Sequence, residues 1–188
     1  MNHFENAIKE LQTVSISDYE DRVEDICRDL EFETLEEDSW PDFFFPELLK
    51  LLSDEKFLSV RTSWHLLKFI EGNWEYLSAA EVSTLKKVLV EAFDKFGGEF
   101  MGPFLVAEML GEFYPDSHTL ETLITLNRTS KPLARELVPL GFENLARSTS
   151  NQALRESAIA ELKTLLQDAS EPVRHEAALS LGRIERAK

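Results

Sequence analysis

The chain lacks the features that would indicate disulfide bonds, secretion or insertion into a membrane. It has one cysteine in 188 residues, so no disulfide can form within it, and nothing requires an oxidising compartment. No apolar run approaches the roughly 20 residues that span a bilayer. Residues 1–6 also lack the basic and apolar stretches of a secretory signal. We therefore expect a cytoplasmic protein that has no membrane-spanning segment.

Basic residues are scarce in the first third of the chain. Residues 1–60 contain 17 Asp and Glu against 5 Lys and Arg, a net charge of −12. Residues 61–188 contain 18 against 15, a net charge of −3. Such a field repels nucleic-acid phosphates and anionic lipid headgroups and attracts basic proteins. We expect a basic protein as the partner, and neither nucleic acid nor a membrane.

The residue patterns of common catalytic and metal sites are also missing. The four histidines, His3, His65, His118 and His175, have no second His or Cys at a metal-ligand spacing. Cys27 lies on the apolar stripe of a predicted helix, so we interpret it as a small core residue and not as a nucleophile. There is no phosphate-binding glycine-rich loop and no Gly-x-Ser-x-Gly motif. We therefore predict no enzyme activity, no metal site and no cofactor.

Helical periodicity dominates the whole sequence. Capping-box patterns begin at Ser17 and Ser78, and no segment alternates as a strand would. Residues 1–45 predict an acidic helical pair followed by a connection over 32–45, where acids and aromatics mix without a period. Residues 46–188 predict four further pairs in one domain spanning 1–188. The predicted helices cover about 46–53, 58–71, 78–96, 103–114, 117–127, 132–146 (kinked at Pro139), 151–168 and 172–185.

A short phrase occurs twice, about 114 positions apart. Leu51-Leu52-Ser53-Asp54 precedes Val60-Arg61, and Leu165-Leu166-Gln167-Asp168 precedes Val173-Arg174. The second copy resembles a HEAT repeat, and the match is closer over about 150–186 than over 46–71. The resemblance implies an all-α, HEAT-like α-solenoid of about five antiparallel helical pairs, built to bind macromolecules.

The turn of this phrase gives specific expectations for side chains. Asp168 can accept hydrogen bonds from N–H groups of the turn. Val173 is expected to pack inward, and the small side chains of Ala177 and Ala178 would let neighbouring helices approach. Arg174 is expected to reach turn carboxylates such as that of Asp168.

In size, charge and fold the chain resembles small acidic bacterial immunity proteins, which neutralise toxin domains from neighbouring cells. Many of those toxins are basic nucleases. The first hypothesis is therefore a protein that inhibits a basic partner by occlusion, as an immunity protein does. The alternatives are a HEAT-repeat adaptor or scaffold protein and a HEAT-like chromophore lyase.

The acidic-aromatic segment and the helix before it are the predicted binding site. Acids there would steer the partner, and an aromatic ring would anchor it. The candidates are Asp21, Glu24, Asp25, Glu36, Glu37, Asp38, Trp40 and Asp42. In the alternative interpretation the aromatics are core, and two of Phe43, Phe44 and Phe45 pack while one is partly exposed. Binding would then be sought on the second helices, near Arg61, Arg135 and Arg174.

Overall fold

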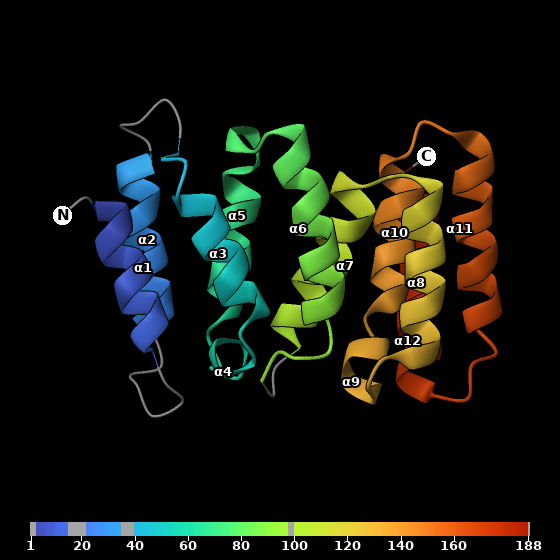
Figure 1. Ribbon diagram of the computed structural model, residues 1–188. Coiled ribbons are helices and arrows are strands. Elements are labelled where there is room, and N and C mark those ends of the chain that lie inside the picture. Colours follow the sequence, from blue (N-terminus) through green and yellow to red (C-terminus); the bar gives the residue numbers. More distant parts are fainter. Residues whose placement is uncertain (1–2, 15–21, 35–39, 98–99, 188) are drawn as a thin grey trace. The chain divides into compact units, whose positions relative to one another are not determined.

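The computed structural model describes residues 3–14, 22–34, 40–97 and 100–187, which form helices and connections without any strand (Figure 1). The all-α prediction is confirmed. Within these residues, no helix has both the length and the apolar character needed to cross a membrane. The helices are α1 His3–Thr13, α2 Arg22–Thr34, α3 Phe44–Ser53, α4 Glu55–Leu58, α5 Trp64–Gly72, α6 Ala79–Ala92, α7 Met101–Phe113, α8 Ser117–Thr129, α9 Pro132–Arg135, α10 Val138–Ser148, α11 Gln152–Leu165 and α12 Glu171–Arg186, with a 3-10 turn, η1, at Trp74–Tyr76.

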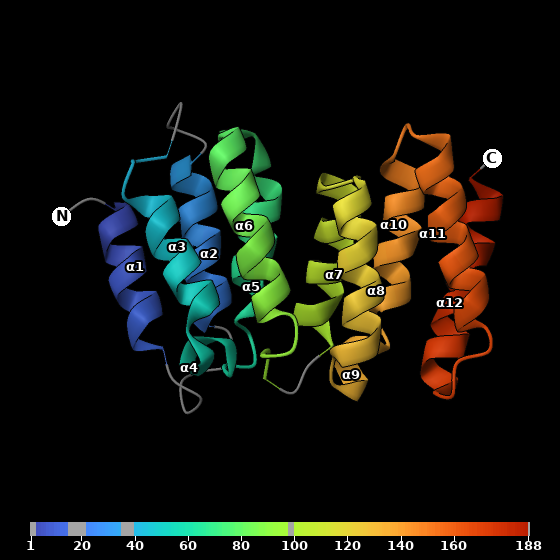
Figure 2. The same ribbon diagram turned by 45° about the vertical axis from the view of Figure 1, so that its right-hand side comes forward.

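The chain divides into two compact units, unit 1 over Met1–Gly102 and unit 2 over Pro103–Lys188. In unit 1, α1 packs against α2 and α3, α2 packs against α5, and α3 packs against α6 (Figure 1 and Figure 2). The position 45/46, where the sequence suggested a change from the acidic pair to the repeats, falls inside unit 1. The acidic first pair of helices therefore belongs to the same compact unit as α3 to α6.

Unit 1 is organised around six rings that we call the aromatic cluster. Its members come from α1, the segment before α3, α3 itself, α5 and η1, and they are Phe4, Trp40, Phe44, Phe45, Phe69 and Tyr76. The centroids of the Trp40 and Phe69 rings lie 5.5 Å apart in a stacked arrangement. Phe4 meets Phe44 edge-on at 4.7 Å. Such pairs add to the free energy of burying the rings.

Local capping explains several helix boundaries in unit 1. The capping box at Ser78 is present, since Ser78 accepts from the Glu81 N–H and Glu81 accepts from the Ser78 N–H; the one at Ser17 lies outside the described residues. In place of the predicted helix over 58–71, the structure has the short helix α4, which ends at Leu58, and then α5, which begins at Trp64. Asp54 accepts from the Lys56 N–H at 2.9 Å and so begins α4 early. Ser63 then donates to the Leu58 carbonyl at 3.2 Å within the turn before α5.

Two other boundaries differ from the prediction in unit 1. The sequence placed 32–34 in a connection, but α2 continues to Thr34, whose hydroxyl donates to the Leu30 carbonyl at 2.7 Å. The helix predicted from Pro46 begins two residues earlier, at Phe44. Pro46 is thus the third helical residue, where its missing N–H still needs no partner within the helix.

Unit 2 is built around α10, which packs against α8, α11 and α12 and is buried from Val138 to Ala146. The sequence predicted one kinked helix over 132–146, but the structure has two, α9 and α10. Pro139 is the second residue of α10, so the chain breaks before the proline and loses no helical hydrogen bond. The terminal pair follows the prediction closely, since α11 and α12 each begin within one residue of the predicted start. The apolar residues Leu154, Ala158, Leu162 and Leu165 of α11 are all buried.

A buried carboxylate joins α10 to α12. Glu143 is 1% exposed, and its carboxylate accepts from Arg183 Nε at 2.7 Å and from Arg147 Nη1 at 3.3 Å. Arg183 also pairs with Glu176. Burial by itself would lower the pKa of Arg183, but its bonds to Glu176 and Glu143 outweigh burial and raise it. The charge inside unit 2 is therefore compensated by its own helices.

Two glycines let α7 and α10 approach each other closely. A Cβ on Gly111 would lie 2.4 Å from the Gly141 carbonyl oxygen and 2.7 Å from the Leu145 nitrogen, both backbone atoms.

Gly182 in α12 has more space around it. A Cβ on Gly182 would have the end of the Arg186 side chain, at 3.7 Å, as its nearest neighbour.

Gly111→Ala should destabilise the protein by about 1–3 kcal/mol, because backbone atoms cannot move aside as side chains do. Gly182→Ala, the matched control, should be neutral or stabilise α12 by up to about 1 kcal/mol, since it restricts the unfolded chain. Urea unfolding followed by far-ultraviolet circular dichroism measures both changes. Equal midpoints for the two variants would contradict the close approach.

Candidate partner-binding surface

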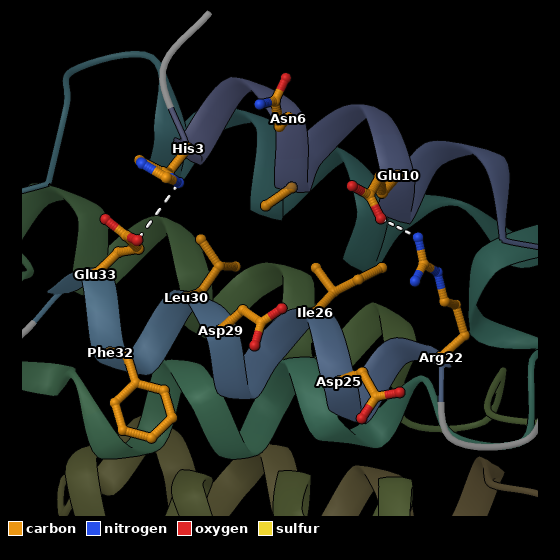
Figure 3. A pocket seen from close by; sticks show the side chains of 11 residues that line it. His3, Asn6, Glu10, Arg22, Asp25, Ile26, Asp29, Leu30, Phe32 and Glu33 are labelled. Carbon is orange, nitrogen blue, oxygen red and sulfur yellow. Dashed lines mark hydrogen bonds and ion pairs between the residues drawn. The ribbon is translucent and has the colours of Figure 1, made fainter.

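A groove of about 330 Å³ runs between α1 and α2 in unit 1 (Figure 3). Both helices turn an apolar stripe inward, and on α1 this stripe consists of the buried residues Phe4, Ala7, Ile8 and Leu11. The polar side chains of the two helices therefore face outward along the groove. Its lining residues are His3, Asn6, Ala7, Glu10, Arg22, Asp25, Ile26, Asp29, Leu30, Phe32 and Glu33.

The groove is acidic. Four carboxylates and one guanidinium line it, which gives a net charge of −3 when His3 is counted as neutral. Its floor is apolar, because Ala7, Ile26 and Leu30 line it and are 9%, 5% and 2% exposed. An acidic rim over an apolar floor suits a side chain that has an aliphatic stem and a cationic head.

Contacts between polar side chains join α1 to α2 at both ends of the groove (Figure 3). Arg22 donates to Glu10 at one end. His3 Nδ1 lies 3.4 Å from a Glu33 oxygen at the other. Exposed pairs of this kind stabilise little, but here they define the length of the groove. Asp29 lies between them in Figure 3, in the exposed middle of the groove.

The structure describes half of the predicted site residues. Asp21, Glu36, Glu37 and Asp38 lie outside the described residues. Asp25 lines the groove and pairs with Arg28. Glu24 and Asp42 do not line it: Glu24 lies 3.4 Å from His65 Nε2, and Asp42 is exposed before α3. Glu24 and Asp25 also lie in the first turn of α2, where a carboxylate favours the helix dipole.

Trp40 is part of the core of unit 1. Its side chain is 9% exposed, and its ring lies against four others of the aromatic cluster. Phe44 and Phe45 are buried while Phe43 is 39% exposed, so two of the three consecutive phenylalanines pack, as the core interpretation expected. A ring packed in this way has little surface to offer a partner.

Phe32 is an exposed aromatic residue beside the acids of α2, and it was not among the residues predicted to bind a partner. Its ring is 66% exposed and lines the groove. The sequence does contain a signal for it. The buried stripe of α2 is Val23, Ile26, Cys27 and Leu30, and Phe32 falls off that stripe once the helix is extended to Thr34. An aromatic residue off the apolar face of a helix points to solvent.

The repeated phrase forms a turn held by side chains in unit 2. Asp168 accepts from the Ser170 N–H at 2.8 Å, as predicted, and also pairs with Arg135. Arg174 was expected to reach a carboxylate of the turn. It donates instead to the backbone carbonyls of Asp168 and Ala169, at 2.7 and 3.0 Å.

Small residues at the start of α12 agree in part with the HEAT-based expectation. Val173 and Ala177 are buried and Ala178 is exposed. Of the arginines considered for an alternative binding face, Arg135 and Arg174 contact this turn. Arg61 lies in unit 1 and is exposed.

The other candidates for chemistry have structural surroundings. Cys27 is buried in α2, and burial, with a smaller contribution from Glu31, raises the pKa of its thiol. Among the described residues, no group of three or more His, Cys, Asp or Glu is placed to hold a metal ion. Comparison of the chain with known protein families, with characterised proteins and with solved structures finds no match.

Trp40→Ala should lower the free energy of unfolding by about 3–5 kcal/mol, because it leaves a cavity among packed rings. Phe43→Ala, at a neighbouring exposed position, should cost less than about 1 kcal/mol. All three tryptophans, Trp40, Trp64 and Trp74, lie in unit 1, so the fluorescence of Trp64 and Trp74 during urea unfolding reports on this unit. An unchanged midpoint for Trp40→Ala would show that the ring is not part of the core.

The thiol of Cys27 should not react with a disulfide reagent in the folded protein at pH 8. Its raised pKa keeps it protonated there, and its burial blocks access. Absorbance of the released thiolate measures the reaction, and the same protein in concentrated urea serves as the control. Rapid modification without denaturant would contradict the core assignment.

Proposed function

We propose that the protein is a HEAT-like module that inhibits a basic partner protein by occlusion. In its specific form, the proposal is a cytoplasmic immunity protein that neutralises a toxin nuclease. The observation that supports it most is the location of the negative charge. Residues 1–60 have a net charge of −12, and the groove between α1 and α2 has one of −3. A surface of this charge attracts cationic proteins and repels nucleic acid.

The HEAT-like part of the proposal is supported by unit 2. Helices α11 and α12 are joined by a short turn and pack against each other. The turn contains the Asp168 and Arg174 contacts described above, and Val173 and Ala177 are buried where α12 begins. HEAT-like stacks of antiparallel helical pairs bind other macromolecules along their surfaces.

The proposed mechanism needs no chemistry from the chain. The surface with which a nuclease holds its substrate is positively charged because it contacts phosphates, so an acidic protein can cover it by presenting carboxylates in place of the substrate. Long-range attraction then speeds the encounter, and the contacts that become desolvated slow the dissociation. Inhibition follows because the substrate and the inhibitor compete for the same cationic surface.

Capture from cells of the source organism followed by mass spectrometry would identify the partner. The decisive measurement is the activity of the purified partner with and without this protein. We expect a basic partner whose activity falls to zero at equimolar inhibitor. Binding without inhibition would indicate an adaptor or scaffold instead, and tight binding to duplex DNA or RNA at physiological salt would contradict the proposal.

Replacing Glu36, Glu37 and Asp38 together by neutral residues should slow association with the partner by about three- to ten-fold at low salt. The same change at Glu121, Glu156 and Glu185, all exposed in unit 2, is the matched control and should have a smaller effect. Stopped-flow association rates at increasing ionic strength measure both variants. The rate for the unaltered protein should fall as salt rises, and a rate that ignores salt would rule out electrostatic steering.

A further inference from the structure

The middle of the groove holds a carboxylate that no described side chain compensates. Asp25 pairs with Arg28 and Glu10 pairs with Arg22, whereas Glu33 lies 3.4 Å from His3 Nδ1, which is charged only when it is protonated. Asp29 is exposed, and its carboxylate takes no ion pair or hydrogen bond within the part of the chain that the structure describes. It is therefore the lining carboxylate that can accept a new partner without first displacing a neighbouring side chain.

Asp29 lies beside an apolar floor and an exposed aromatic ring. Ile26 and Leu30 occupy the floor, and Phe32 lines the groove with its ring 66% exposed. Such surroundings favour a side chain with an aliphatic stem and a cationic head, because the stem covers apolar surface while the head meets the carboxylate. A cation close to the ring gains a further attraction from the aromatic face.

The spacing of the acids on α2 favours a guanidinium over an ammonium. Asp25 and Asp29 are four residues apart on one helix and both line the groove, and such positions bring Cβ atoms to about 5–6 Å. A planar guanidinium with five donors can bind two carboxylates at once, whereas an ammonium acts as a single point charge.

We propose that this groove binds an arginine side chain from an exposed basic segment of the partner protein. The guanidinium bonds to Asp29 and Asp25, and the methylene stem lies over Ile26 and Leu30. The assignment of this arginine to a partner protein rests on the proposed function. The groove charge of −3 and the wider charge of −12 in residues 1–60 complement such a segment and repel nucleic acid.

The test uses nuclear magnetic resonance of the whole ¹⁵N-labelled protein and a short capped peptide with arginine at every third position and alanine elsewhere. Saturable shifts should appear at the amides of α1 and α2. Asp29→Lys should raise the Kd of the peptide about ten-fold or more, because it places a like charge against the arginine. Glu31→Lys, the same change on the same helix but at a residue that does not line the groove, should raise it less than about three-fold.

Two further peptides test the chemistry of the occupant. A peptide with lysine in place of arginine should bind several-fold more weakly, and one with glutamate should not bind. Equal binding of the lysine peptide would overturn arginine as the occupant. Shifts outside α1 and α2, equal effects of the two variants, or no binding at low salt would overturn the groove itself. If the arginine peptide binds as expected but the purified partner is not inhibited, the proposed function is wrong and the groove is still an arginine-binding site.

Discussion

Unit 1 depends on the packing of Trp40 against the rings of the aromatic cluster. This one side chain contacts rings from α3, α5 and η1, and Phe44 in turn contacts Phe4 of α1. The cluster therefore fixes the first helix to the helices that follow, and α2 is held between α1 and α5. Both helices that form the groove therefore pack against helices that contribute to this core.

The burial of these rings also decides what a partner can meet. Large rings in contact exclude water and gain stability from their full area, so the acidic-aromatic segment contributes Trp40, Phe44 and Phe45 to the core. The carboxylates of α1 and α2 stay outside, because a buried unpaired charge costs far more than an exposed one. Phe32 escapes the core since it lies off the apolar stripe of α2. The resulting surface combines free and paired acids with one exposed ring.

In unit 2 the same separation of core and surface is reached with small residues and compensated charge. Gly111 and Gly141 allow α7 and α10 to approach through their backbones, and Arg183 neutralises the buried Glu143. Asp168 and Arg135 tie α9 to the turn before α12. These contacts satisfy charged groups within the unit, whereas Asp29 in the groove of unit 1 has no described partner.

Local sequence patterns were enough to predict the helical class, the capping box at Ser78, the apolar stripe that contains Cys27, and the Asp168 turn, because each depends on residues within one or two turns of helix. They also located the acidic region. Tertiary structure alone decided that Trp40 is buried and Phe32 exposed, that Arg174 binds carbonyls while Arg135 takes the Asp168 carboxylate, and that Asp29 lies between two inter-helix pairs. Those outcomes depend on which side chains from distant segments compete for the same space or the same charge, and local periodicity contains no information about that competition.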